Sequence, residues 1–94
     1  MSEVDDIIKA RGGDTGPYGP FIDNAEVAQA IKKTLRRGRA WDHMHHDERE
    51  ALDLIALKMS RVVTGNDPHY IDNWDDIQGY AKIVTDRLRQ GTGE

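Results

Sequence analysis

Three stretches of the chain place apolar residues three or four positions apart, which is the spacing of one face of an α-helix. They span about 23–37, 48–64 and 72–89. The middle stretch is apolar almost all round, which predicts a central, buried helix. The last stretch has an apolar stripe expected to face a core, formed by Trp74, Ile77, Ala81, Val84 and Leu88. The pattern predicts an all-α fold of three main helices.

Capping residues and glycines set the limits of these helices. Asp23 or Asn24 is expected to cap the first, and Asp47 the second, with Glu50 at its third position. Gly65 is expected to end the second helix as a C-terminal glycine. The connections are short, so consecutive helices are predicted to pack antiparallel as a small bundle.

The chain is predicted to form one domain, 1–94. Residues 1–22 are expected to hold a short N-terminal helix and a glycine/proline-rich loop, residues 23–90 the helical core, and residues 91–94 a frayed tail. A domain of 94 residues has a marginal core of its own, so association into a homo-oligomer is expected.

Composition narrows the class of protein. The net charge is -4 with both signs mixed along the chain, which argues against binding to duplex nucleic acid. There is no cysteine, so disulfides and thiolate metal sites are excluded. No apolar run approaches the roughly 20 residues that span a membrane, and no signal peptide follows Met1. A soluble cytoplasmic protein is expected.

The segment Asp72–Ala81 has the highest density of chemically active side chains, with three carboxylates, two amides, an indole and a phenol. Helical spacing puts Asp72, Asp76 and Tyr80 on one stripe, with Asn73 beside it. Asn73, Trp74 and Tyr80, together with Tyr18 in the loop, are expected to contact a ligand or to pack against the core. For Asp72 or Asn73, a helix cap is the simpler alternative.

Paired acids on the second and third helices suggest a metal site. Glu50 and Asp53 lie three residues apart, and antiparallel packing could bring them near Asp72 and Asp76. Oxygen ligands of this kind suit Mg²⁺. Asp72 and Asp76 would hold the metal, while Glu50 and Asp53 would be the catalytic carboxylates that activate water.

Two basic residues on the second helix could either bind substrate at this site or pair with its acids. Lys58 and Arg61 could bind the phosphate oxygens of a nucleotide. Alternatively, they could neutralise Asp72 and Asp76 in structural salt bridges. The linker histidines at 43, 45 and 46 are expected to be exposed, because their spacing does not match helical zinc sites.

The chain resembles a small family of uncharacterised phage and prophage proteins over nearly its whole length. The resemblance rests on Arg11-Gly12, Tyr18-Gly19, Asn24, Lys58-Met59-Ser60-Arg61 and Asp72-Asn73-Trp74-x-Asp76-Ile77-x-Gly79-Tyr80-Ala81. It implies a phage-encoded protein that acts in the cytoplasm of the host cell. No activity is established for that family, so the resemblance implies none.

More distantly, the acidic helices resemble the MazG-like all-α nucleotide pyrophosphohydrolases. Those enzymes carry Glu-Glu-x-x-Glu on one helix and Glu-x-x-Asp on the next, with Mg²⁺ between them. Here Glu50-x-x-Asp53 and Asp72-x-x-Asp75 match in part, and the double glutamate is missing. The resemblance implies Mg²⁺-dependent cleavage of a nucleoside triphosphate to a monophosphate and pyrophosphate.

Two functions therefore stay open at this point. One is the pyrophosphohydrolase-like enzyme, which requires the four acids to converge on one pocket. The other is a non-catalytic phage accessory protein that binds a host protein or a small ligand, with its acids paired to Lys58 and Arg61. Gly79, inside the third helix, predicts close approach of another backbone or a large side chain. Solvent exposure of Gly79 is the alternative.

Overall fold

The computed structural model describes residues 17–91, and this part of the chain is helical without strands. Its elements are α2 (Phe21–Leu35), the short 3-10 helix η1 (Trp41–His43), α3 (His46–Thr64) and α4 (Ile71–Arg89). The all-α prediction is confirmed for these three main helices. The predicted N-terminal helix lies outside the described residues, as does the end of the predicted tail.

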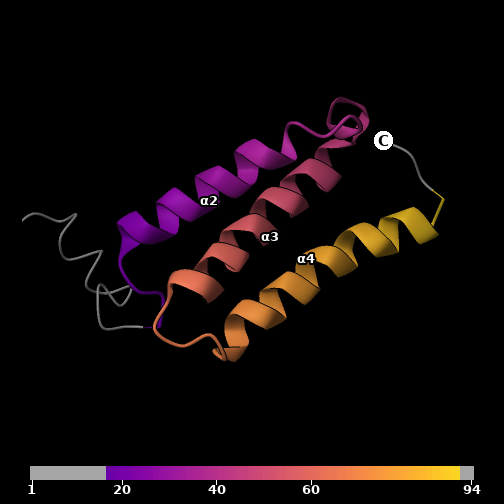
Figure 1. Cartoon of the computed structure of the whole chain (residues 1–94). Helices are drawn as coiled ribbons and strands as arrows, with labels where there is room; N and C mark the ends of the chain where they lie inside the picture. The colour runs from indigo at the N-terminus through magenta and orange to yellow at the C-terminus, as the bar shows by residue number, and fades with distance from the viewer. Residues whose placement is uncertain (1–16, 92–94) are drawn as a thin grey trace, which may run out of the picture.

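The three helices lie side by side, with α3 between α2 and α4 (Figure 1). Neighbours run antiparallel, as the short connections predicted. Helix α3 contacts both flanking helices extensively. The central position predicted for this helix is confirmed.

Two helix starts differ from the prediction. Helix α3 begins at His46, and the backbone N–H of His45 donates to Glu48 Oε1 at 2.7 Å. The predicted roles of Asp47 and Glu50 at this cap were wrong, because the helix starts earlier and Glu48 takes the third helical position. Helix α2 likewise begins at Phe21, before the predicted caps.

The chain buries a small apolar core of its own. Its buried apolar residues, within the described part, are Ala28, Trp41, Ala51 and Ala56. The buried polar residues are Asn24, Lys58, Ser60 and Asn73. Alanines let antiparallel helices approach closely, but they bury little apolar area. Polar side chains therefore occupy much of the contact between the helices.

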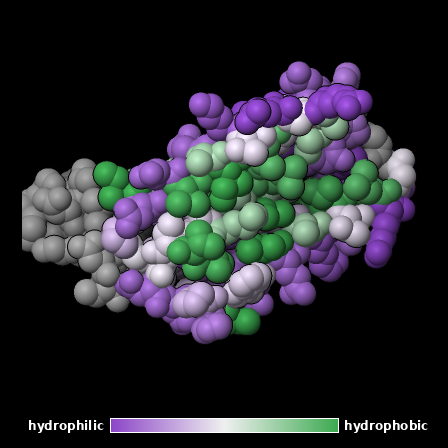
Figure 2. Space-filling model, viewed as in Figure 1, coloured by the Kyte–Doolittle hydropathy of each residue, from purple (hydrophilic) through white to green (hydrophobic). Residues whose placement is uncertain are grey.

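Large apolar side chains stay in contact with solvent. Met59 and Val63 of α3 are 46% and 69% exposed, and Trp74 and Leu88 of α4 are 51% and 54% exposed. The expectation that α3 and the Trp74 stripe are buried is therefore wrong for these residues, because α3 has helices on only two sides. Apolar atoms run along the middle of the face in Figure 2, with charged atoms along its edges. None of the described helices has the length and apolar character needed to cross a membrane.

Candidate functional site

The loop between α3 and α4 fixes which residues of the two helices face each other. Asp47 pairs with Arg87 near one end of the hairpin, and Lys58 pairs with Asp76 near the other. An antiparallel pair with this register places Arg61 level with Asn73. Among the described residues that carry the phage-family resemblance, Tyr18, Arg61 and Asp72-Asn73-Trp74 therefore lie at the end of the bundle next to the α3–α4 loop.

Lys58 and Asp76 form an ion pair across the hairpin. Lys58 Nζ lies 2.8 Å from Asp76 Oδ2, and the exposed fractions of the two side chains are 11% and 45%. The ammonium group is already held by a carboxylate. For this one pair, the geometry agrees with the alternative prediction that the acids form structural salt bridges.

Arg61 has a different environment. Its guanidinium carbon lies 4.8 Å from the centre of the Tyr18 ring, a cation–π contact. Among the described residues it forms no ion pair, so the predicted neutralisation of Arg61 by a carboxylate is not seen there. Its Nε is buried and has no hydrogen-bond acceptor. Arg61 is thus a half-buried cation with an unused donor.

Asn73 supplies a second unused donor at the same level. The side chain is 1% exposed, and its Nδ2 has no hydrogen-bond partner. Helix α4 already starts at Ile71, so a capping role for Asn73 is wrong. The neighbouring Trp74 stays half exposed and donates from Nε1 to the carbonyl of Pro68 at 3.1 Å.

Tyr70, which precedes the first residue of α4, lies next to Tyr18 and was not among the predicted site residues. Its ring packs edge-on against Tyr18, with 5.9 Å between ring centres. A hydrogen bond to Asp72, and the charge of that carboxylate, raise the pKa of Tyr70 above its ordinary value. Asp72 thus serves as an acceptor for a phenol. Tyr80, also predicted for this site, is half buried and lies about two helical turns beyond Asn73 on α4.

The predicted catalytic acids lie elsewhere. Asp53 accepts two hydrogen bonds from Arg36, the residue that follows α2, at 3.0 and 2.8 Å, and faces away from α4. Glu50 is exposed. Within residues 17–91, no three histidine or acidic side chains are arranged to hold a metal ion. Magnesium binding therefore stays a prediction that has no ligand set in the described part of the chain.

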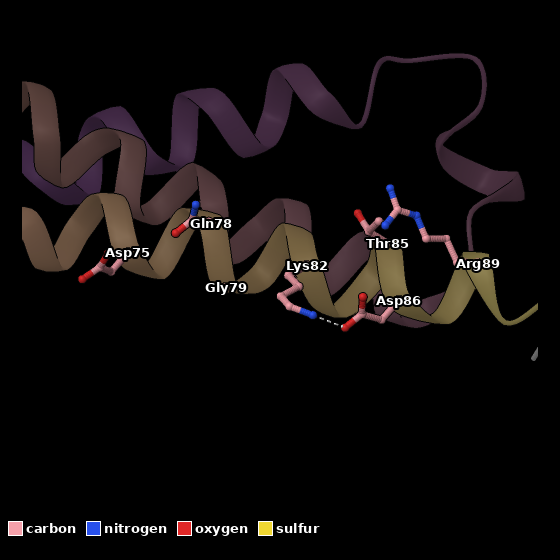
Figure 3. A pocket seen from close by; sticks show the side chains of 7 residues that line it. All are labelled: Asp75, Gln78, Gly79, Lys82, Thr85, Asp86 and Arg89. Carbon is pink, nitrogen blue, oxygen red and sulfur yellow. Dashed lines mark hydrogen bonds and ion pairs between the residues drawn. The ribbon is translucent and has the colours of Figure 1, made fainter.

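A shallow groove follows the outer edge of α4 (Figure 3). It is lined by Asp75, Gln78, Gly79, Lys82, Thr85, Asp86 and Arg89. All come from one helix, and Lys82 pairs with Asp86 at 2.6 Å. A Cβ built on Gly79 meets no atom of the described residues within 4 Å, so the predicted close approach of α3 or Tyr18 is wrong and Gly79 is exposed. Close approach of a partner subunit stays a prediction.

Comparisons with protein-family models, with curated proteins and with solved structures found no significant match to this chain. The resemblances to the phage family and to the MazG-like enzymes therefore stay predictions. The arguments that follow rest on the geometry of the chain itself.

The sequence did indicate that two further polar residues, Asn24 and Ser60, are important. Asn24 and Ser60 belong to the segments that carry the phage-family resemblance, and both are buried. The Ser60 hydroxyl donates to Asn24 Oδ1, which links α3 to α2. A polar residue among the apolar positions of α3 indicated that a partner was needed, but spacing alone did not identify it.

Proposed function

We propose that this protein is a non-catalytic, all-α binding protein whose ligand presents an anionic group to Arg61. The observation that carries the proposal is the state of this side chain. It is a half-buried cation without an ion pair in the described structure, and its Nε lacks an acceptor. A buried charge or donor without a partner is costly, which favours binding of a group that supplies both.

The surroundings of Arg61 favour a small ligand with a carboxylate or phosphate group. The planar guanidinium binds such groups through two parallel hydrogen bonds, and a ring stacked on it, here Tyr18, holds it in one orientation. Asn73 Nδ2 offers a further donor at the same level.

Isothermal titration calorimetry with the full chain tests this proposal. The probes are inorganic phosphate, a nucleoside triphosphate and a small dicarboxylate, each with and without Mg²⁺. Binding is expected without Mg²⁺, and Arg61→Gln is expected to abolish it. Arg61→Lys should weaken it, since lysine keeps the charge but lacks the planar fork.

Arg49→Gln is the matched control. Arg49 lies on the same helix and also stacks on an aromatic ring, that of Trp41 at 5.8 Å. Its Nε already donates to the carbonyl of Trp41 at 2.9 Å. Binding should survive in this variant. No binding of any probe, or equal binding by Arg61→Gln, would contradict the proposal.

The pyrophosphohydrolase-like function is tested in the same samples. We expect no pyrophosphate to be released from the nucleoside triphosphate in the presence of Mg²⁺. Release that depends on Glu50 and Asp76 would instead support the enzyme. The proposal also includes action in the cytoplasm of a host cell, for which the support is the resemblance to phage proteins.

A further inference from the structure

Helix α3 has an apolar stripe that neither flanking helix covers. Asp53 and Ser60 mark its side toward α2, and Asp47 and Lys58 mark its side toward α4. With 3.6 residues per turn, the broad arc outside both contacts holds Leu52, Met59 and Val63. Met59 and Val63 are 46% and 69% exposed.

Helix α4 extends this apolar surface. Trp74, Ala81 and Leu88 lie on one side of its contact with α3, and Asp72, Gly79 and Ile83 lie on the other. Because both helices are right-handed and run antiparallel, the Trp74 side faces the same way as Met59 and Val63. We call this surface the apolar face, defined by Leu52, Met59, Val63, Trp74, Ala81 and Leu88. Figure 2 shows hydrophobic residues, in green, along the middle of the molecule.

The arrangement of charge indicates what covers the apolar face. The end of the bundle formed by residues 29–53 and 82–91 carries nine Lys or Arg and six Asp or Glu residues. The end formed by residues 17–28 and 54–81 carries two Lys or Arg and six Asp or Glu residues. One end is therefore net positive and the other net negative along the described part of the chain.

Helix α2, which lies beside the apolar face, repeats this asymmetry. Asp23 and Glu26 lie in the first half of α2, whereas Lys33 and Arg37 lie at its other end, and all four are exposed. A second copy turned end to end would bring the acidic half of each α2 over the basic half of its partner's α2. A copy packed in the same direction would instead bring like charges together.

We propose that the apolar face is covered by a second copy of this chain, in a dimer with twofold symmetry and the helices of the two copies antiparallel. In such a dimer the same patch is used on both copies, so an apolar centre and a charge pattern that is complementary to itself are both required. The proposal does not depend on the ligand site, because Arg61 and Asp72 lie on the opposite side of the layer of helices.

Sedimentation equilibrium of the full chain tests the dimer. We expect twice the mass of the 10.6 kDa chain. Val63→Asp should raise the dimer Kd by about 100-fold or more, because a charge enters the apolar face on both copies. Ile83→Asp is the matched control, since Ile83 is 63% exposed but lies on the other side of α4. Its Kd should stay within the error of the wild type, and circular dichroism should show unchanged helix content in both variants.

The antiparallel orientation is tested with exposed charges that do not affect the fold. Arg37→Glu and Asp23→Lys should each raise the Kd by about tenfold at low salt, since symmetry makes each contact occur twice. The double variant should recover affinity if basic and acidic halves of α2 meet. Failure of the double variant to recover would overturn the antiparallel arrangement.

Other outcomes would overturn the dimer itself. A full chain that stays monomeric at the highest concentration measured would mean that something other than a second copy covers the apolar face, residues 1–16 or a different protein among them. A dimer unaffected by Val63→Asp would place the interface on another surface. A larger assembly that forms through Val63 would exclude the twofold dimer.

Discussion

The ammonium group of Lys58 on α3 lies 2.8 Å from a carboxylate oxygen of Asp76 on α4. The lysine side chain is 11% exposed, whereas the aspartate is 45% exposed. A cation in that position is costly without a partner, because its hydration is largely lost. The pair therefore favours the register in which α4 lies against α3, and it occupies the lysine that the sequence suggested for phosphate binding.

Asp76→Asn is expected to lower the free energy of unfolding by about 2 kcal/mol. This free-energy change lies between that of a surface ion pair and that of a broken buried pair, since Asp76 is nearly half exposed. Urea denaturation measures it. Asp75→Asn is the control, because Asp75 is exposed and forms no ion pair in the described structure; its stability should not change.

The same two variants address the metal hypothesis. If Asp76 is a partner of Lys58, millimolar Mg²⁺ should leave the thermal melt of the wild type unmoved. A melt raised by Mg²⁺ in the wild type and not in Asp76→Asn would restore the predicted metal site. A fully stable Asp76→Asn protein would show that the ion pair contributes nothing.

Tyr70 is expected to show a pH-dependent contribution to stability. Its pKa is raised in the folded state, first by the hydrogen bond to Asp72 and then by the charge of that carboxylate. A group with a raised pKa contributes fully below its unfolded pKa, and the contribution is lost as the pH rises through the folded value. The effect should therefore appear only in the alkaline range, above the ordinary tyrosine pKa of 10.0.

Spectrophotometric titration of the tyrosines measures this shift. Asp72→Asn should lower the pKa of Tyr70 toward that of an ordinary tyrosine, while Asp75→Asn should leave it unchanged. Tyr70→Phe identifies which of the three tyrosines is responsible. If the titration curve of Asp72→Asn overlaps that of the wild type, the hydrogen bond is not made in solution.

The helices could be predicted from the sequence because the spacing of apolar residues is a local signal. The α4 prediction, 72–89, differs from the structure by one residue at its start. For α2 the start was placed two residues late, since Asp23 and Asn24 are good capping residues but fall inside the helix. Helix ends depend on weak preferences, and tertiary contacts such as that of buried Asn24 override them.

The candidate site was harder to predict because α3 has two neighbours. Spacing shows which residues of α3 share a side, but not which flanking helix each side meets. Asp53 faces α2 and pairs with Arg36, while Lys58 faces α4 and pairs with Asp76. The stacking of Arg61 on Tyr18 depends on the path of a loop, which no periodic pattern encodes.

Ser60→Ala is expected to be destabilising although alanine has the higher helix propensity. Ser60 is fully buried, and its hydroxyl donates to Asn24 Oδ1 and also lies 2.7 Å from the carbonyl of Leu57. The substitution leaves a buried amide oxygen without its donor, which should cost about 1–3 kcal/mol. Thermal or urea denaturation measures the loss.

A double-mutant cycle separates this bond from simple loss of volume. The cost of Ser60→Ala should shrink when Asn24 is already alanine, because no acceptor is then left unpaired. Additive losses in the double variant would mean that the two side chains do not interact. Thr34→Ala on the exposed side of α2, whose hydroxyl bonds only its own helix at 2.9 Å, serves as a control.

Two glycines should respond to the same substitution with opposite signs. Gly79 is exposed within α4, and a Cβ there meets nothing within 4 Å. Gly79→Ala should therefore raise the free energy of unfolding by about 1 kcal/mol through helix propensity alone. It should leave the dimer Kd unchanged, since Gly79 lies outside the apolar face.

Gly65 has a different constraint, which the sequence suggested only in part. It was predicted as the glycine that ends the helix, and α3 does end at Thr64 before it. Its φ is -78° and its backbone is extended, so a left-handed conformation is not the reason for glycine here. Its Cβ would instead contact the carbonyl oxygen of Pro17 and lie 2.6 Å from that of Arg61. Neither backbone oxygen can move cheaply, because Pro17 also accepts a hydrogen bond from Asn66 at 3.2 Å. Gly65→Ala should cost about 1–3 kcal/mol in a urea melt. A neutral Gly65→Ala would mean that the Pro17 loop does not pack against the end of α3.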